Sequence, residues 1–381
     1  MKTARGSSLL LLVPCGLSLL ACSGSSSSPP PLPAPSPSPS PSVAPAPVGL
    51  QLLHGAGPIV KATVNGTIHM DLLVDTGAAG TVLSAQALGV TGLAPGTYQA
   101  HTLRSLVLPN GHRLDSLPIQ VADTNLSQPN AGYVNGVLGL DVLETFGCVT
   151  FDYRAGRLRF EDTQGSGAAV IPYTLNDGFR PWAPVTVGSL PLGEMLLDNG
   201  TVFTRLTPTI HASLPGPPAT IFQSVVFTVS GQELVPYVVL DAYAVGGAQA
   251  PAGIQAQVAN FSAVGGTYFR EYLTTFCFAD RELKLTPYTS RAHIHPSAIE
   301  RLGLQIDIAD AAELIGVAGG GAAEAAGLVV GDRLVSIDGQ AIGSLGYLGV
   351  YALLGDPGKA AFTVVFMRGS GPPTSVVLMA P

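Results

Sequence analysis

The chain has few charged side chains, since Asp, Glu, Lys and Arg together make up 11% of its 381 residues. The formal net charge is −7, so no strongly basic surface is expected and nucleic acid is not an expected partner. Tryptophan occurs once and cysteine four times. Glycine and proline are instead frequent, with 46 and 32 residues, which predicts many turns and short strands rather than helical bundles. The length is sufficient for two or three domains.

The apolar segment near the N-terminus is too short to span a bilayer, which needs about 20 apolar residues. It covers residues 9–20 and follows two basic residues, an arrangement typical of an export signal. The sequence Leu-Leu-Ala-Cys22 at its end resembles the lipobox of bacterial lipoproteins, in which cleavage precedes a cysteine that becomes acylated. We therefore expect a lipoprotein signal peptide at 1–21 and a lipid on Cys22. The alternative is an ordinary signal peptide that is cut nearby.

Residues 22–48 consist largely of Ser, Pro and Ala. Such a segment cannot bury a core, and its proline content favours an extended chain of about 3.1 Å per residue. We expect a linker that holds the folded part away from the membrane. The residue after Cys22 is Ser and not Asp, which suits sorting to an outer membrane. The expected location is thus the bacterial cell envelope, exported and lipid-anchored, on the periplasmic or surface side.

An acidic residue lies between two apolar runs in residues 70–84, which read Met-Asp-Leu-Leu-Val-Asp-Thr-Gly-Ala-Ala-Gly-Thr-Val-Leu-Ser. The apolar runs predict strands. A carboxylate at the end of a buried strand is costly unless it has a partner or a role. Gly77 allows the backbone to turn tightly beside Asp75. The pattern therefore predicts a strand that delivers Asp75 to a functional turn.

The same pattern recurs without a gap 123 residues later, where residues 193–206 read Gly-Glu-Met-Leu-Leu-Asp-Asn-Gly-Thr-Val-Phe-Thr-Arg-Leu. Asp198 takes the place of Asp75, and Gly200 takes the place of Gly77. A second shared element follows each acid, Val-Leu-Gly139 in the first half and Ala-Val-Gly265 in the second. An internal repeat of this kind predicts two similar lobes, each of which contributes one acid.

These motifs resemble those of aspartic peptidases, in which a hydrophobic-hydrophobic-Gly segment passes beneath each Asp-Thr-Gly loop. The resemblance implies a mostly β fold, a pseudo-dimer of β-barrel lobes at 49–164 and 165–290 in one monomeric chain, closer to retropepsin than to pepsin. It implies that Asp75 and Asp198 are catalytic and share one proton while they activate a water. It implies neither a metal nor an organic cofactor.

The two active-site loops differ at one position. In the family, a threonine hydroxyl links the two loops; Thr76 supplies it in the first loop, whereas Asn199 occupies the matching place in the second. An Asn side chain offers a donor and an acceptor, but it is larger than Thr. We expect Thr76, Gly77, Asn199 and Gly200 to support the active loops.

Two alternating segments predict hairpins beside the cleft, at 106–114 and 225–235. The resemblance implies that the first acts as a flap over the cleft; a plain surface hairpin is the alternative. Its tip carries no tyrosine, and Tyr98 precedes it.

Two cysteines remain after the signal peptide and the lipid site are set aside, namely Cys148 and Cys277. They lie in corresponding hairpins of the two lobes, and an oxidising compartment would allow a disulfide. The sequence does not show whether their Cα atoms come within bonding range. A disulfide across the pseudo-dyad and two buried free thiols therefore both stay open.

Residues 297–381 form a third unit. The segment 319–339, Gly-Gly-Gly-Ala-Ala-Glu-Ala-Ala-Gly-Leu-Val-Val-Gly-Asp-Arg-Leu-Val-Ser-Ile-Asp-Gly, resembles the most specific stretch of bacterial PDZ domains. Leu302, Gly303 and Leu304 resemble their carboxylate-binding loop. The resemblance implies a β-sandwich or barrel with short helices and a groove that binds an extended peptide as an added strand. We expect this unit to recruit protein substrates.

The sequence therefore favours a membrane-tethered aspartic endopeptidase whose PDZ domain binds peptide or positions substrate. The alternative is a non-catalytic envelope lipoprotein that binds peptides through a decayed peptidase fold and a PDZ domain. Retention of both acids favours the enzyme. His293 and His295 alternate, but no third ligand is nearby, so a metal site is not expected. The expected partners are a protein or peptide substrate, a PDZ ligand and the membrane.

Substitution of Cys22→Ser should release the protein from the membrane fraction or block its maturation, because the lipobox is the anchor that the sequence predicts. Metabolic labelling with a fatty-acid analogue measures this directly. Equal labelling of the Ser variant would place the acyl group elsewhere.

Overall fold

The computed structural model describes residues 46–53, 56–94, 97–122, 134–160, 169–176, 179–228, 231–251, 253–290, 297–307 and 312–380. The predicted signal peptide, Cys22, most of the Ser/Pro-rich linker, His293 and His295 lie outside these residues. Within them, no helix has both the length and the apolar character needed to cross a membrane. The fold is mostly β, as predicted.

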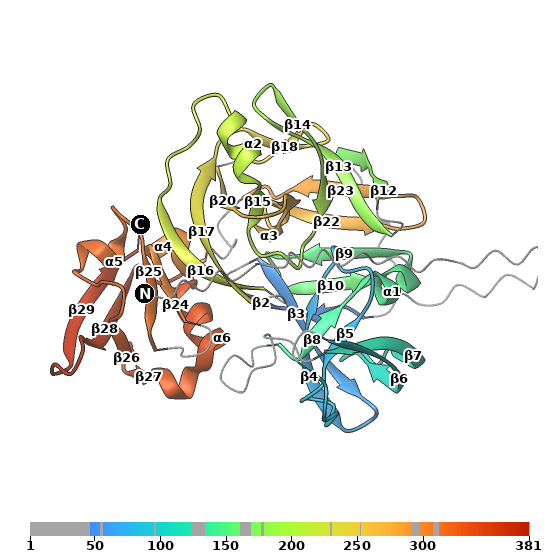
Figure 1. Cartoon of the computed structure of the whole chain (residues 1–381), viewed down its shortest axis with the longest axis horizontal. Helices are drawn as coiled ribbons and strands as arrows, with labels where there is room; N and C mark the ends of the chain where they lie inside the picture. The colour runs from blue at the N-terminus through green and yellow to red at the C-terminus, as the bar shows by residue number, and fades with distance from the viewer. Residues whose placement is uncertain are drawn as a thin grey trace, which may run out of the picture. The chain divides into compact units, whose positions relative to one another are not determined.

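The first lobe contains a mixed sheet with the strand order β2-β3-β4-β8-β5-β7-β6 (Figure 1). Its strands are Gln51–Leu53 (β2), Gly57–Val64 (β3), Ile68–Val74 (β4), Val82–Ser84 (β5), Tyr98–Val107 (β6), Arg113–Ala122 (β7) and Gly136–Leu138 (β8). Asn65 and Gly66 join β3 to β4 with φ angles of 51° and 85°, the left-handed conformation that a tight hairpin turn requires. The hairpin expected around residues 106–114 is formed by β6 and β7.

The second lobe repeats this plan in a larger sheet, with the order β16-β17-β20-β15-β21-β14-β13-β18-β19 and with β12 paired to β13. Its strands are Thr174–Asn176 (β12), Arg180–Val187 (β13), Leu190–Leu197 (β14), Thr204–Leu206 (β15), Phe222–Thr228 (β16), Gly231–Leu240 (β17), Tyr243–Val245 (β18), Ala248–Gln249 (β19), Ile254–Val258 (β20) and Ala263–Val264 (β21). The hairpin of β16 and β17 is the one expected at 225–235. A short helix, α2 (Pro208–Ser213), begins at Thr207, whose hydroxyl caps the amide of Ile210.

A third sheet joins the two lobes, with the order β1-β10-β9-β22-β23-β11. It consists of Val48–Gly49 (β1), Cys148–Asp152 (β9), Arg157–Phe160 (β10), Ala169–Pro172 (β11), Tyr272–Cys277 (β22) and Glu282–Pro287 (β23). The strands β9 and β22, one from each lobe, lie side by side at its centre (Figure 1). Cys148 faces Cys277 in this register, and the two form a disulfide. The sheet and the disulfide together hold the lobes to each other.

The C-terminal unit has its own apolar core and two small sheets, one of β24 and β25 and one ordered β27-β26-β28-β29. Its elements are α4 (Ala298–Leu302), β24 (Leu304–Ile306), β25 (Leu314–Val317), α5 (Ala322–Ala325), β26 (Arg333–Ile337), β27 (Gln340–Ala341), α6 (Ile342–Leu354), β28 (Ala361–Met367) and β29 (Thr374–Met379). The short helix, turn and strand expected from the segment 319–339 are therefore present.

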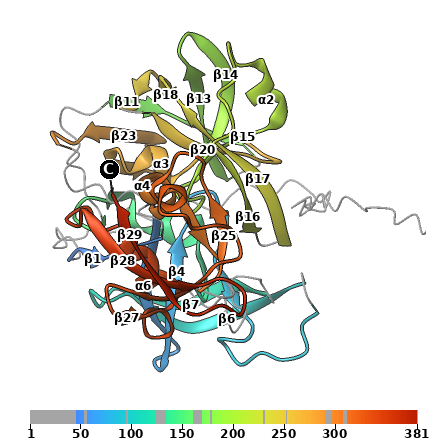
Figure 2. The same cartoon turned by 90° about the vertical axis from the view of Figure 1, so that its left-hand side faces the viewer.

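The C-terminal unit also packs against both lobes. Ile299 of α4 and Ala318 join an apolar cluster with Phe203 and Tyr237 of the second lobe, and β25 lies beside β16 (Figure 2). On the first lobe, α6 contacts β2. The C-terminal unit thus contacts both lobes, the second through α4 and β25 and the first through α6.

Removal of the disulfide by Cys148→Ala together with Cys277→Ala should lower the free energy of unfolding. The bridge closes a loop with a sequence separation of 129 residues, and a loop of this length is expected to contribute about 3 to 5 kcal/mol. Denaturant unfolding of both proteins measures the difference. Two titratable thiols in the native wild-type protein would contradict the disulfide.

Candidate active site

The two acids occupy equivalent positions at the ends of equivalent strands. Asp75 follows β4, which pairs in parallel with β8, and Asp198 follows β14, which pairs in parallel with β21. The amide of Asp75 donates to the carbonyl of Leu138 at 3.0 Å, and the amide of Asp198 donates to the carbonyl of Val264 at the same distance. The hydrophobic-hydrophobic-Gly segments therefore hold the acid-bearing loops from beneath, as the repeat predicts.

Glycine permits the two loops to meet. A Cβ on Gly77 would lie 2.4 Å from Cγ of Asp198, and a Cβ on Gly200 would lie 2.3 Å from Cγ of Asp75. Contacts this short are not tolerated, so any side chain at either glycine would force the loops apart. The structure thus brings Asp75 and Asp198 face to face, with each glycine against the acid of the opposite lobe.

Buried threonines tie each active loop to the segment beneath it. The Thr81 hydroxyl accepts from the amide of Gly139 at 3.1 Å and donates to Asp141 at 2.7 Å. In the second lobe, the hydroxyl of Thr204 accepts from the amide of Gly265 at 3.2 Å. The equivalence of the two bonds shows that the internal repeat extends from sequence to hydrogen-bonding pattern.

The two loops are cross-linked through Thr76 and Asn199. The Thr76 amide donates to Oδ1 of Asn199 at 2.8 Å, and the Thr76 hydroxyl donates to the carbonyl of Leu197 at 2.8 Å and accepts from the amide of Asn199 at 3.2 Å. Asn199 therefore replaces the acceptor function of a second threonine. Its amide nitrogen is buried. Burial raises the pKa of the Tyr153 hydroxyl, and a hydrogen bond with the Asn199 side chain acts in the opposite direction.

The carboxylates differ in their hydrogen-bond donors. Asp75 accepts from the amides of Gly77 and Ala78 at 2.7 and 3.1 Å. Asp198 accepts from the amide of Thr201 at 2.8 Å and also from its hydroxyl at 2.7 Å. Ala78 is the counterpart of Thr201 in the repeat and has no hydroxyl. The two carboxyl groups thus have two donors each, but only Asp198 receives one of them from a side chain.

The electrostatic environment favours the protonated form of Asp75. Burial raises the pKa of Asp75 well above its ordinary value of 3.8, and the negative charge of Asp198 and the hydrogen bond between the two carboxyl groups raise it further. The amides of Gly77 and Ala78 act in the opposite direction but are outweighed. Two carboxyl groups this close bind one proton more tightly than an isolated acid would.

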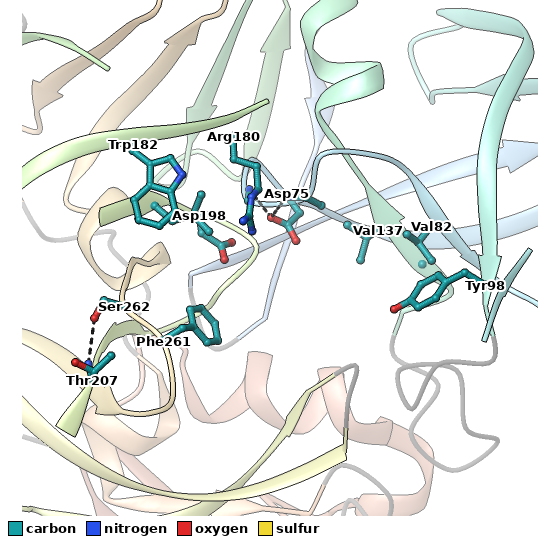
Figure 3. Close-up of a pocket in the computed structure, with 14 residues that line it drawn as sticks. Asp75, Val82, Tyr98, Val137, Arg180, Trp182, Asp198, Thr207, Phe261 and Ser262 are labelled. Atoms are coloured by element: carbon teal, nitrogen blue, oxygen red, sulfur yellow. Dashed lines mark hydrogen bonds between the residues drawn. The ribbon is translucent and has the colours of Figure 1, made fainter. Parts of the chain in front are cut away.

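A cavity of about 610 Å³ opens at the two acids. Both lobes contribute to its largely apolar walls, the first through Val82, Tyr98 and Val137 and the second through Trp182, Leu196 and Phe261. Figure 3 shows Asp75 with Asp198 and Trp182 to one side of it and with Val82, Val137 and Tyr98 to the other. The acids thus lie in an apolar cleft that can exclude water from a bound chain.

Three wall residues carry no motif in the sequence. The sequence did not identify Trp182 and Phe261 as residues of the site, although Trp182 is the single tryptophan of the chain and aligns with Ile59 in the repeat. Arg180 also lines the cavity. Tyr98 reaches the cavity from the start of β6, whereas the tip of the candidate flap at 108–112 is not part of the wall. The flap role of this hairpin stays a prediction.

The predicted carboxylate-binding loop lies in the C-terminal unit, away from the acids. The side chains of Leu302 and Leu304 are buried in the core of that unit. Gly303 has a φ of 70° and lines a second cavity of about 570 Å³ with residues 319–321. A peptide at this loop would therefore contact its backbone and not the two leucine side chains.

Comparison with protein families gives two matches. Residues 60–142 match the aspartyl protease family, and residues 314–366 match the PDZ domain. The first match contains Asp75 and Gly139 but ends before Asp198, so the second lobe is assigned from the internal repeat and from its geometry. A search of curated proteins gave no match. The protein thus joins an aspartyl protease unit to a C-terminal PDZ domain.

Proposed function

We propose that the protein is an aspartic endopeptidase that hydrolyses peptide bonds with Asp75, Asp198 and a water molecule. The observation that carries the proposal is the reciprocal approach of Gly77 to Asp198 and of Gly200 to Asp75, which places two carboxyl groups together at the base of an apolar cleft. A structural role alone would not require two acids to be buried beside each other, because like charges at this separation are costly.

The different environments of the two acids suggest their roles. Asp75, with its raised pKa, holds the shared proton and donates it to the carbonyl oxygen of the scissile bond. Asp198, stabilised as an anion by both donors of Thr201, accepts a proton from the water as the water oxygen attacks the carbonyl carbon. That proton then passes to the departing nitrogen when the carbon–nitrogen bond breaks, which restores the starting protonation state.

The membrane tether and the PDZ domain complete the proposal. Acylation of Cys22 would hold the enzyme in the bacterial envelope, and the PDZ domain would bind extended peptides through main-chain hydrogen bonds. Monomeric function is consistent with a chain that contains both lobes. A second candidate, a peptide-binding protein without catalysis, is favoured by one observation, namely the presence of Asn199 in the place of a second threonine in the loop cross-link.

Asp75→Asn and Asp198→Asn should each reduce the rate of peptide hydrolysis to the background level, since the first removes the group that holds the shared proton and the second removes the base. Asn keeps the Oδ1 acceptor that binds the loop amides, so both variants should remain folded. Cleavage of an unstructured protein, with and without pepstatin, and circular dichroism measure the two properties. Substantial turnover by either variant would exclude the two-acid mechanism and support another.

Asp75 should make the fold less stable as the pH rises. Its folded pKa is raised above the ordinary value of 3.8, so the folded state binds the proton more tightly than the unfolded state. The contribution of Asp75 protonation to the free energy of unfolding is therefore fully present below pH 3.8. It is lost as the pH rises through the pKa of Asp75 in the folded state. Asp75→Asn should therefore have a higher Tm than the wild type at neutral pH, with a smaller difference near pH 3.

The matched control for this measurement is Asp115→Asn, because Asp115 is exposed and lies in a surface ion pair with Arg113. Its Tm should follow the wild-type profile. A wild-type protein as stable as Asp75→Asn across this pH range would contradict the raised pKa.

A further inference from the structure

The repeat defines two equivalent subsites, one on each side of the paired acids. In the second lobe, Trp182 and Leu196 line the open cavity (Figure 3). Their counterparts 123 residues earlier in the first lobe are Ile59 and Leu73. An extended substrate that crosses the two acids would place one side chain in each subsite, because successive side chains of an extended chain point to opposite faces.

The first-lobe subsite is already filled. Ile59 is 1% exposed and Leu73 is 9% exposed. They form a buried cluster with Leu53, Val134 and Val137. Ala78 and Val202 of the two active loops and Tyr347 and Leu348 of the C-terminal unit pack against it. The subsite that would mirror the Trp182 pocket therefore contains side chains of the protein itself.

The close packing around Gly57 shows that the first-lobe subsite has little free volume. Gly57 is the counterpart of Arg180 in the repeat. A Cβ on Gly57 would lie 3.0 Å from Cγ2 of Val202 and 3.2 Å from Cβ of Leu53. Arg180, in contrast, borders the open cavity. The first lobe is thus tightly packed at Gly57, whereas the equivalent position of the second lobe borders open space.

The two residues that close the subsite belong to a firmly anchored helix. Gly346 interrupts α6 with φ and ψ of 64° and 177°, and Tyr347 and Leu348 follow this break directly. Beyond them, the Tyr351 ring lies 4.8 Å from the Tyr347 ring, and the Tyr351 hydroxyl accepts from the amide of Ile306 at 2.9 Å. The C-terminal unit therefore holds Tyr347 and Leu348 in place against this apolar cluster.

We propose that Tyr347 and Leu348 determine substrate specificity by filling the first-lobe subsite. The substrate then has a bulky apolar side chain on one side of the scissile bond, which enters the pocket of Trp182 and Leu196, and a small residue such as Gly or Ala on the other side. This inference rests on the proposed peptidase function and assigns a cleft-forming role to the C-terminal unit.

Three short peptides that differ only in their central pair test the proposal on the full mature chain. The pairs are Phe-Phe, Phe-Ala and Ala-Phe. One of the two mixed orders should be cleaved with a kcat/KM at least about tenfold above that of Phe-Phe, because a filled pocket rejects added bulk. Cleavage of Phe-Phe as fast as both mixed peptides would overturn the proposal.

Leu348→Ala tests whether the Leu348 side chain causes the preference for a mixed peptide over Phe-Phe. It should raise kcat/KM for Phe-Phe by about tenfold and should leave the preferred mixed peptide within about twofold. The matched control is Leu353→Ala on the same helix, since Leu353 packs against the core of the C-terminal unit. An equal gain in Leu353→Ala, or no gain in Leu348→Ala, would contradict a specificity role for Leu348.

Binding provides a readout that does not depend on hydrolysis. In an Asp75→Asn background, the fluorescence of Trp182, the single tryptophan, should report the dissociation constant of each peptide. The mixed peptide should bind more tightly than Phe-Phe, and Leu348→Ala should remove the difference. If these differences in binding are observed but the wild type hydrolyses no peptide, the peptidase function is refuted and the subsite assignment is retained. Hydrolysis by the wild type without this binding pattern would refute the subsite assignment and retain the peptidase function. The absence of both hydrolysis and the binding pattern would refute both hypotheses.

Discussion

The contact between a glycine and the opposing carboxyl group is the constraint on which the two-lobed unit depends. Gly77 lies against Asp198 and Gly200 lies against Asp75, and neither position has space for a methyl group. Loops that meet this closely must arrive in a defined register. The parallel pairings of β4 with β8 and of β14 with β21 provide that register. The joint sheet and its disulfide then keep the two lobes at the required separation.

Close approach of two acids has an electrostatic cost, which the site reduces in unequal ways. Both acids receive backbone donors, but only the second loop adds a hydroxyl, from Thr201. The proton shared by the pair lowers the repulsion, and the raised pKa of Asp75 reflects this. The cross-link between Thr76 and Asn199 is unequal as well. A site built from two repeats therefore places its two acids in different surroundings, because their neighbours do not match.

The same loss of symmetry extends to the walls of the cleft. The second lobe has Trp182 at the position where the first lobe has Ile59. Trp182 lines the open cavity, whereas Ile59 belongs to a buried cluster against which the C-terminal unit packs. A PDZ domain is usually regarded as a separate binding module. In this chain its helix α6 contacts β2 of the first lobe, and Tyr347 and Leu348 of this helix pack against the apolar cluster that contains the cavity-wall residue Val137.

Local features of this protein could be predicted from its sequence. The 123-residue repeat identified both acids and both loop glycines, because each strand and turn has a short-range signature. The hairpins expected at 106–114 and 225–235 also appear where the sequence placed them, since turn chemistry and alternation act over a few residues.

Contacts between distant segments were decided by the tertiary structure. The sequence left the state of Cys148 and Cys277 open, because only the pairing of β9 with β22 places them opposite each other. Trp182 had no motif, and its exposure to the cavity follows from the twist and pairing of β13. Leu348 is 275 positions from Leu73 in the chain, yet both belong to one apolar contact. Periodicity and spacing describe neighbours along the chain, whereas the docking of three units depends on the shapes of their folded surfaces.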